Sequence, residues 1–323
     1  MANIRIRLFA RMKAAFTLVV LSLVVCQAFA GFEQNIINDD DLILDQALVD
    51  SINSAQGSWK AEMSPRFQGV TVREVKALLG TDLSVESNLP VHSYDDVSDV
   101  PASFDATTQW PDFIHPIRNQ EQCGSCWAFA ASEVLSDRYG IATNGSENAV
   151  LSPESLVSCD KTDMGCQGGN LNNAWNFLRD TGITTDKCFP YTAGGGNAPA
   201  CQSTCTDGSA MKLYKSADAY NLKSVADIQK DIMTNGPVEA GFTVYKSFMS
   251  YKSGVYTKHW YEFSALGGHA VKIVGWGTED KTDYWLIANS WGPTWGLEGF
   301  FKIKRGVNEC GIESQVYAGH VSA

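Results

Sequence analysis

Hydrophobic residues recur at helical spacing in the middle of the chain. Between Trp127 and Leu135 the apolar positions repeat every three or four residues, which is typical of a packed helix. A second helix is indicated where Ser152 precedes Pro153, because proline is tolerated at the first helical position. Helices are therefore expected from Cys126 onward, after Ser152, around 171–178 and over 224–235.

The pattern changes after Gly236. The segments that follow are rich in β-branched and aromatic residues and are separated by glycines, which is typical of strands. Strands are expected over 237–245, 270–276, 284–288 and 300–304. Helices followed by strands predict an α+β fold with two lobes, one helical and one a sheet or barrel, and with a cleft between them.

Separated segments of the chain carry residues suited to nucleophilic catalysis. Cys126 lies at a predicted helix start, where the helix dipole and a protonated histidine would both favour a thiolate. Such surroundings lower the pKa of a thiol from about 8.5 into the range of roughly 3.5 to 7.5. His269 would pair with this thiolate and later protonate the leaving amine. Asn289 would accept the other ring N–H, while Gln120 and the Cys126 backbone N–H would donate to the oxyanion.

These motifs resemble those of the papain-like cysteine proteases. The resemblance rests on Cys-Gly-Ser-Cys-Trp-Ala-Phe from Cys123, Gly-Gly-His-Ala from Gly267 and Asn-Ser-Trp from Asn289, and it extends from about residue 100 to the C-terminus. The segments that begin at Pro101, Tyr251 and Cys310 are similar to the cathepsin B branch. The resemblance implies a papain-like fold with a helical left lobe, a β-barrel-like right lobe and the active-site cleft between them. It also implies hydrolysis of peptide bonds through a thioester, without a cofactor or a metal.

Family correspondence also assigns individual roles. Each of these residue types, taken alone, is usually a packing or turn residue, so the roles depend on the combination. Trp291 would cover the bond between imidazole and amide, although it could equally belong to a tryptophan core with Trp276, Trp285 and Trp295. The catalytic residues implied are Cys126, His269 and Asn289, with Gln120 as the oxyanion donor.

Substrate-binding residues are implied on both sides of the cleft. Gly168 and Gly169 match the family's glycine shelf, where an extended peptide adds as a strand, and a simple tight turn is the alternative. The pocket for the second residue before the scissile bond would be walled by Leu171, Gly241 and Ala270, with Gln315 at its floor. Because cathepsin B has an acid at the position of Gln315, a preference for Leu, Val or Phe over Arg is expected.

The chain departs from the cathepsin B pattern at two places near the cleft. Glu121 and Gln122 replace the small Gly-Ser pair common in relatives, which would alter loop geometry and local charge. The second departure is the occluding loop, whose paired histidines confer dipeptide removal in cathepsin B. Only 12 residues separate Cys188 from Cys201, and none of them is a histidine. An endopeptidase with an open cleft is therefore expected.

Residues 1–30 have the composition of a secretory signal peptide. Basic residues precede an apolar stretch over 14–25, and an Ala-Phe-Ala cleavage motif precedes Gly31. A signal anchor is the alternative, but the apolar stretch is short for a membrane span. The chain is therefore expected in the secretory pathway, destined for a lysosome, a vacuole or the extracellular space, with no membrane attachment after signal cleavage.

Residues 31–99 form a distinct acidic block with a net charge of −9, against −6 for residues 100–323. An amphipathic segment over 39–54 and a capping-box pattern at Thr71 and Glu74 predict short helices, the second of them stopped by Gly80. The block resembles the inhibitory propeptide of cathepsin B-like zymogens, and an acidic linker is the alternative. Protonation of its carboxylates would offer acid-triggered release. Residues 100–323 would then be the mature peptidase domain.

Cysteines give a separate constraint. Of nine, Cys26 would leave with the signal and Cys126 is the nucleophile, so seven remain and at least one further thiol is free. Sequence alone leaves 15 pairings of six open, and short-spaced pairs lack the histidine that a zinc site would need. The resemblance implies Cys123–Cys166, Cys159–Cys201 and Cys188–Cys205, with Cys310 free. The sequon at Asn144 predicts N-glycosylation.

The expected partners follow from these assignments. They are peptide and protein substrates, the chain's own propeptide as an inhibitor, and cystatin-like inhibitors, with the enzyme itself a monomer. The net charge of −11 disfavours nucleic acid as a partner. Two other functions share these residues: a catalytically silent papain-like binding protein, and a transpeptidase that uses the same thioester.

Overall fold

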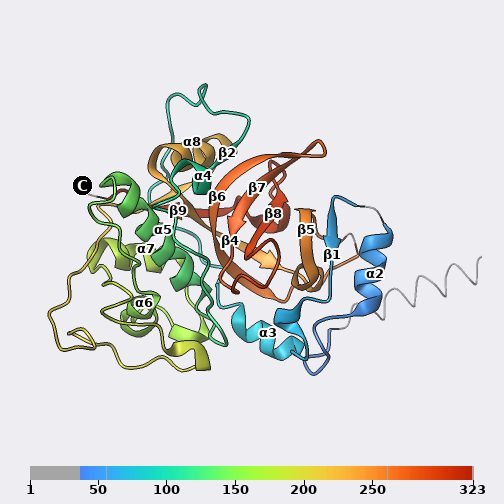
Figure 1. Cartoon of the computed structure of the whole chain (residues 1–323), viewed down its shortest axis with the longest axis horizontal. Helices are drawn as coiled ribbons and strands as arrows, with labels where there is room; N and C mark the ends of the chain where they lie inside the picture. The colour runs from blue at the N-terminus through green and yellow to red at the C-terminus, as the bar shows by residue number, and fades with distance from the viewer. Residues whose placement is uncertain (1–36, 56, 260, 322–323) are drawn as a thin grey trace, which may run out of the picture.

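The computed structural model describes residues 37–55, 57–259 and 261–321. In Figure 1 the helices that follow Cys126 gather on the left and most strands lie on the right, beside the two helices of the N-terminal block, which confirms the predicted α+β arrangement of two lobes. The expected signal peptide lies outside the described residues. Within the ranges given above, no helix is both long enough and apolar enough to cross a membrane.

The left lobe is built around a helix that is buried on nearly every side. Helix α5 begins at Cys126, and all of its residues through Arg138 are buried. The Ser152 hydroxyl caps the next helix by accepting the Ser155 N–H, and Pro153 occupies its first turn as the sequence indicates. The helices of this lobe are α5 (Cys126–Ala142), α6 (Pro153–Cys159) and α7 (Leu171–Asp180).

The right lobe is one sheet in the order β1-β5-β8-β7-β6-β4-β9-β3, with β2 also paired to β6. All of these pairs are antiparallel except β5 with β8. Helices α4 (Ala106–Gln109) and α8 (Val225–Asn235) lie at the top of Figure 1. The strands are β1 (Trp59–Ala61), β2 (Phe104–Asp105), β3 (Tyr220–Leu222), β4 (Val238–Val244), β5 (Tyr251–Tyr256), β6 (Gly267–Glu279), β7 (Thr282–Ala288), β8 (Phe300–Lys304) and β9 (Gln315–Ala318).

The sheet is not closed into a barrel, which corrects the barrel-like lobe implied by the resemblance. Its strand order is a line whose two ends, β1 and β3, do not pair with each other. Both ends involve the acidic N-terminal block: β1 comes from that block, and Val91 forms a bridge with Asn221 of β3. The N-terminal block therefore pairs with the backbone at both ends of the open sheet.

The N-terminal block wraps the right lobe and reaches the junction between lobes (Figure 1). Trp59 of β1 is buried against the rings of Tyr251 and Tyr256. The helix expected over 39–54 is shorter, because the Asp45 carboxylate accepts the N–H groups of the first turn and starts the helix there. The elements of this block are α2 (Gln46–Ser54), β1, the 3₁₀ turn η1 (Pro65–Phe67) and α3 (Val72–Leu78).

The capping box of α3 forms as the sequence predicts. The Thr71 hydroxyl accepts the Glu74 N–H, and the Glu74 carboxylate accepts the Thr71 N–H. The helix ends at Leu78, so Gly80 lies two residues beyond it and does not form its cap. A Cβ on Gly80 would lie 1.9 Å from the Gly124 carbonyl oxygen. Glycine is therefore required there for close approach of two backbones, and not for helix termination.

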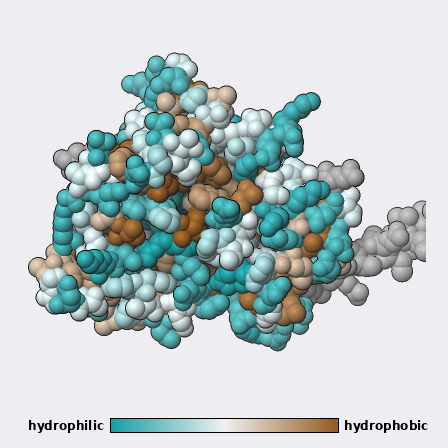
Figure 2. Space-filling model, in the orientation of Figure 1, coloured by the Kyte–Doolittle hydropathy of each residue, from teal (hydrophilic) through white to brown (hydrophobic). Residues whose placement is uncertain are grey.

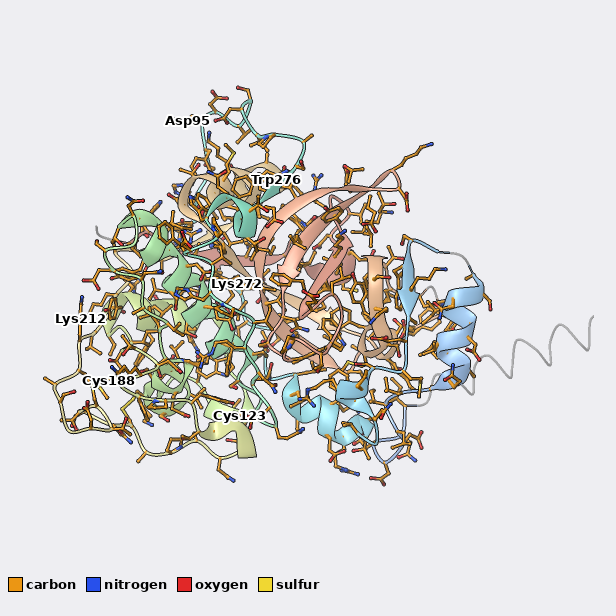
Figure 3. The ribbon with its side chains drawn as sticks, viewed as in Figure 1. Asp95, Cys123, Cys188, Lys212, Lys272 and Trp276 are labelled. Carbon is orange, nitrogen blue, oxygen red and sulfur yellow. A yellow bond between two sulfur atoms is a disulfide. The ribbon has the colours of Figure 1, made fainter. Side chains whose placement is uncertain are left out.

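Buried charges join the two lobes at their interface. Lys272 of β6 lies at the centre of the molecule in Figure 3, and its Nζ is 2.6 Å from Asp137 and 3.7 Å from Glu133, both on α5. All three side chains are buried, so the pairs are shielded from solvent.

The face of the molecule in Figure 2 is largely hydrophilic, with apolar atoms gathered only in small groups.

Candidate active site

Cys126 lies at the first residue of α5 and is fully buried. Its sulfur is 3.1 Å from the Thr81 hydroxyl, which belongs to the N-terminal block. Burial raises the pKa of the Cys126 thiol, and hydrogen bonds from Thr81 and nearby backbone groups oppose that rise. In this covered state the sulfur is therefore held as a thiol.

His269 lies on β6, at the edge of the right lobe that faces α5. Its Nε2 is 2.7 Å from the Asn289 side-chain oxygen, so that nitrogen carries the proton. Nδ1 is buried and has no hydrogen-bond partner among the described residues, which leaves its lone pair available as a base. Burial lowers the pKa of His269 to about 4, and the Asn289 hydrogen bond opposes the lowering.

Trp291 covers the imidazole of His269. The two rings are stacked, with centroids 4.7 Å apart and an interplanar angle of 28°. The same indole contacts Phe248 and Trp295 edge-on, so it also belongs to the aromatic core. Trp291 therefore both covers the imidazole and belongs to the aromatic core. Trp276 and Trp285 pack against each other elsewhere in the sheet.

Gln120 presents its side-chain amide beside the start of α5. The amide nitrogen donates to the carbonyl oxygens of Leu78 and Cys123, each at 2.9 Å. Its oxygen accepts the Ser290 hydroxyl at 2.7 Å, and this bond fixes which way the amide faces. Ser290 is a site residue that the sequence reasoning missed, although it lies inside the Asn-Ser-Trp motif.

A segment of the N-terminal block runs through the site as an extended strand. The Gly169 N–H donates to the Gly80 carbonyl at 2.8 Å, and the Gly169 carbonyl accepts the Asp82 N–H at 2.9 Å. On the other side, the Gly268 carbonyl accepts the Thr81 N–H at 3.1 Å. The predicted glycine shelf thus binds an extended backbone in this structure.

The two shelf glycines are needed for different reasons. A Cβ on Gly168 would lie 2.8 Å from the Gly80 carbonyl oxygen, so it would obstruct the bound strand. A Cβ on Gly169 would instead lie 2.4 Å from the Trp127 indole. Gly169 therefore permits close packing of the loop on α5.

The four predicted pocket residues come together around one side chain. Gly241 of β4 is directly paired with Ala270 and with Gln315. A Cβ on Gly241 would lie 2.7 Å from the Leu83 side chain and 3.2 Å from the Leu171 side chain. Gln315 donates its side-chain N–H to the Leu83 carbonyl at 2.7 Å. Leu83, from the N-terminal block, therefore occupies the predicted pocket.

The structure contains the three disulfides implied by the resemblance, with Cys126 and Cys310 as the free cysteines of the described residues. The short segment after Cys188 is held by Glu154, whose buried carboxylate accepts the N–H groups of Thr192 and Ala193. No sequence motif indicates this role of Glu154. Asn144 lies in an exposed turn after α5.

The sequence model of one protein family, the papain family of cysteine proteases, matches residues 100–320 of this chain. Cathepsin B-like cysteine proteinase 4 of Caenorhabditis elegans is 42% identical over 311 residues, which cover 85% of this chain and 91% of that protein. Cathepsin B-like CP2 of Giardia intestinalis is 42% identical over 276 residues, covering 83% of this chain and 91% of that protein.

Solved proforms share the fold. The structure of procathepsin B S9 from Trypanosoma congolense has a TM-score of 0.82 and 36% identity, and it covers 88% of this chain and 100% of that one. Digestive procathepsin L2 from Tenebrio molitor has a TM-score of 0.72 at 28% identity, with coverage of 85% and 88%. These similarities support a cysteine peptidase made as a zymogen. The chain is a cathepsin B-like member of the papain family of cysteine proteases.

Proposed function

We propose that the mature protein is a cysteine endopeptidase in which Cys126, His269, Asn289 and Gln120 form the catalytic site. One observation carries this proposal: a peptide segment of the chain already contacts the sulfur, the oxyanion donor and the apolar pocket. The carbonyl of Leu78 accepts a hydrogen bond from Gln120, Thr81 touches the sulfur, and Leu83 fills the apolar pocket. A substrate would use the same contacts once this segment has left.

The proposed reaction assigns one role to each group. Nδ1 of His269 takes the proton of Cys126, and the thiolate attacks the carbonyl carbon of the scissile bond. The negative oxygen accepts a hydrogen bond from the Gln120 amide. His269 then protonates the leaving amine, and a thioester remains on the sulfur. Water, deprotonated by His269, attacks the thioester and restores the thiol and the free acid.

Asn289 and Trp291 would support His269 in this sequence. The Asn289 oxygen, 2.7 Å from Nε2, holds the ring in the tautomer whose Nδ1 is a base. An amide does this without adding a negative charge, so the imidazolium can still transfer its proton. Trp291, stacked on the ring and fully buried, would keep water from competing for the Nε2 bond.

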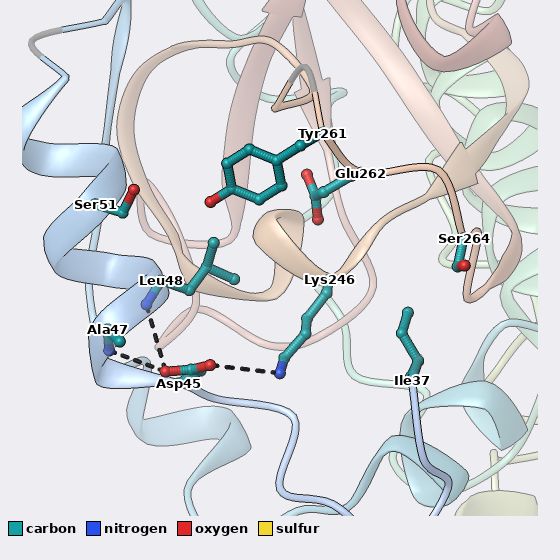
Figure 4. Close-up of a pocket in the computed structure, with 9 residues that line it drawn as sticks. All are labelled: Ile37, Asp45, Ala47, Leu48, Ser51, Lys246, Tyr261, Glu262 and Ser264. Carbon is teal, nitrogen blue, oxygen red and sulfur yellow. Dashed lines mark hydrogen bonds and ion pairs between the residues drawn. The ribbon is translucent and has the colours of Figure 1, made fainter. Parts of the chain in front are cut away.

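We further propose that residues 31–99 are the inhibitory propeptide. Their described part adds β1 to the sheet and packs Phe67 edge-on against Trp291, with centroids 5.3 Å apart. Figure 4 shows where α2 meets the mature domain: the Asp45 carboxylate accepts the N–H groups of its own helix and lies 3.8 Å from Lys246. Inhibition would follow from occupation of the site and not from a change in the site itself.

Acid would promote release of this propeptide. Besides Asp45, Glu62 pairs with Lys252 at 3.1 Å and Asp99 pairs with Lys230 at 2.6 Å, so carboxylates of the block bind lysines of the mature domain at separate places. Protonation of the carboxylates removes these attractions while the lysines keep their charge. Maturation is therefore expected to be faster near about pH 4 to 5 than at neutral pH, as an acidic compartment of the secretory pathway would provide.

Endopeptidase action follows from the short segment between Cys188 and Cys201. It turns through the 3₁₀ helix η3 (Ala193–Gly195), whose Gly194 carbonyl accepts the Gln122 N–H at 2.8 Å. The segment carries no histidine to bind the C-terminal carboxylate of a substrate. Longer peptides would therefore extend past this side of the cleft, and removal of C-terminal dipeptides would be weak.

The test starts from the full zymogen, activated in acid. The mature enzyme should cleave an internal bond in a blocked peptide, and stoichiometric alkylation of Cys126 should abolish that turnover. Cys126→Ala, purified in the same way, is the matched control and should be inactive. Cleavage that survives this substitution would refute the catalytic assignment, and rapid release of C-terminal dipeptides would refute the endopeptidase assignment. Assays with added amines separate hydrolysis from transpeptidation.

A further inference from the structure

Glu121 is an acidic side chain directly beside the oxyanion donor. It follows Gln120, and it adopts a positive φ of 54°, a conformation that favours glycine. The Asn119 side-chain oxygen accepts its N–H at 3.0 Å and holds the turn. The resemblance described in the sequence analysis implies a small Gly-Ser pair at residues 121 and 122, so the acidic side chain is a departure from that pattern.

The carboxylate of Glu121 lies against the short segment that replaces the occluding loop. A Cβ on Gly194 would be 2.1 Å from Oε2 and 2.8 Å from Cδ of Glu121. The missing side chain at Gly194 therefore leaves the space in which the carboxylate lies. Glu121 itself is exposed, so its charge is accessible from solvent.

The path of the propeptide shows which side of the cleft this is. Leu83 fills the pocket for the second residue before the scissile bond, and Thr81 lies at the Cys126 sulfur. Leu78 lies beyond the sulfur, at Gln120. Arg66, still earlier in the propeptide, contacts the Glu121 backbone carbonyl at 3.3 Å, so Glu121 lies toward the Leu78 end of this path and away from the Leu83 pocket. It therefore lies on the side of the sulfur that receives residues after the scissile bond.

A basic side chain already occupies the space beside Glu121 in the zymogen. Nη2 of Arg66 donates to the Glu121 backbone carbonyl at 3.3 Å, and the guanidinium lies 5.1 Å from the Phe67 ring centroid. Burial lowers the pKa of Arg66, and the negative charge of Glu121 opposes that lowering. The propeptide thus places a cation beside Glu121, bound through the Glu121 backbone carbonyl, while Nε of Arg66 has no hydrogen-bond partner among the described residues.

We infer that Glu121 is a specificity-determining residue that selects a Lys or Arg side chain on the leaving-group side of the scissile bond. The inference rests on the proposed endopeptidase function, because it concerns substrate that extends past the cleaved bond. Arg66 leaves with the propeptide, and a basic substrate residue would replace it. The same carboxylate repels the C-terminal carboxylate of a substrate, which adds to the missing histidines in opposing dipeptide release.

The experiment uses mature enzyme, activated from the full zymogen and quantified by alkylation of Cys126. The substrates are internally quenched peptides of one sequence. In each set, one of the first three residues after the scissile bond is varied and is Lys, Gln or Glu. At one of these positions, kcat/KM is expected to be about 2- to 5-fold higher for Lys than for Gln, as for an exposed ion pair. The ratio should shrink as salt is raised from about 0.05 to 0.5 M.

Variants connect the selectivity to one side chain. Glu121→Gln should bring the ratio of Lys to Gln peptides close to 1, and Glu121→Lys should invert it in favour of Glu. Asp280→Asn is the matched control, because Asp280 is also exposed and also has a positive φ, of 47°, but lies in the turn between β6 and β7. This control should keep the wild-type ratio.

The outcomes separate the two proposals. A wild-type ratio of 1 at all three positions, or a ratio that Glu121→Gln leaves unchanged, overturns the role of Glu121 while the endopeptidase function stands. Failure of the alkylatable enzyme to cleave any of the peptides overturns the endopeptidase function and this inference with it.

Discussion

The hydroxyl of Thr81 lies 3.1 Å from the sulfur of Cys126. The contact joins the N-terminal block to the proposed nucleophile across 45 residues of sequence. In this covered site burial raises the pKa of Cys126 and lowers the pKa of His269 to about 4. Above pH 4 and below the raised pKa of the thiol, both groups are neutral. In the zymogen the sulfur contacts Thr81, while Nδ1 of His269 has no hydrogen-bond partner among the described residues, so the two groups have not formed their ion pair.

Alkylation of Cys126 should report this neutral pair. In the zymogen at about pH 6, iodoacetamide should react with Cys126 at least about 10-fold more slowly than in the mature enzyme. In the mature enzyme the propeptide has left, so solvent and reagent reach the sulfur. The zymogen rate should rise with pH, because a raised thiol pKa means that thiolate forms only as the pH increases. Mass spectrometry of the labelled peptides distinguishes Cys126 from Cys310, the other free cysteine. Equal rates in zymogen and mature enzyme at pH 6 would contradict this prediction.

Gly80→Ala should weaken inhibition by the propeptide. The added methyl would meet the Gly124 carbonyl, and overpacking of this kind typically costs about 1–3 kcal/mol, or about 5- to 150-fold in binding. Intact zymogen carrying this substitution should turn over a peptide substrate at neutral pH. Gly57→Ala is the control, since a Cβ there has no neighbour within 4 Å. A silent Gly80→Ala zymogen would show that the backbone contact does not determine inhibition.

Ser290→Ala should impair the oxyanion donor without touching the nucleophile. The lost hydroxyl releases the Gln120 amide, so kcat should fall roughly 10-fold, less than the 10²- to 10³-fold typical of losing such a donor. The alkylation rate of Cys126 should stay near its wild-type value. Gln120→Ala gives the upper bound, and Ser209→Ala, on an exposed turn, serves as the control. A Ser290→Ala enzyme with wild-type kcat would remove Ser290 from the site.

Gln315 should determine the preference for the residue that enters the apolar pocket. Mature enzyme is expected to prefer Leu, Val or Phe over Arg there, since Leu83 fills the pocket in the zymogen. Gln315→Glu places a carboxylate beside that position and should raise kcat/KM for Arg about 3- to 10-fold relative to Leu. Paired substrates that differ only at this residue measure the ratio. Comparable turnover of Phe-Arg and Arg-Arg substrates by the wild-type enzyme would contradict the expected pocket chemistry.

Local pattern was enough to predict most of the longer elements, although strand β5, with six residues, was not predicted. Helix α5 and strands β4, β6, β7 and β8 each carry their own periodicity or β-branched composition, so their existence follows from nearby residues. Strands β1, β3 and β9 are only three or four residues long, and they form because a distant strand offers an edge. No local signal encodes such pairing, and for the same reason the open ends of the sheet were not predicted.

The site divides in the same way. The catalytic roles of Cys126, His269 and Asn289 could be predicted, because the residue types in their motifs indicate nucleophilic catalysis. Ser290 and Glu154 act through hydrogen bonds to residues 170 and 38 positions away, and a serine or glutamate carries no signal for that task. The positions of Thr81 and Leu83 depend on how the block threads the cleft, which only the three-dimensional structure determines.

The ion pair between Lys272 and Asp137 has a consequence for inhibitors. Lys272 lies on the strand that carries His269, and Asp137 lies on the helix that begins at Cys126, so one buried pair ties the base-bearing strand to the thiol-bearing helix. Hinge opening between the lobes would have to break it, at a cost of about 3–5 kcal/mol for a buried charge left alone. The cleft between the two lobes therefore has a nearly fixed width, and inhibitors must enter it as extended chains.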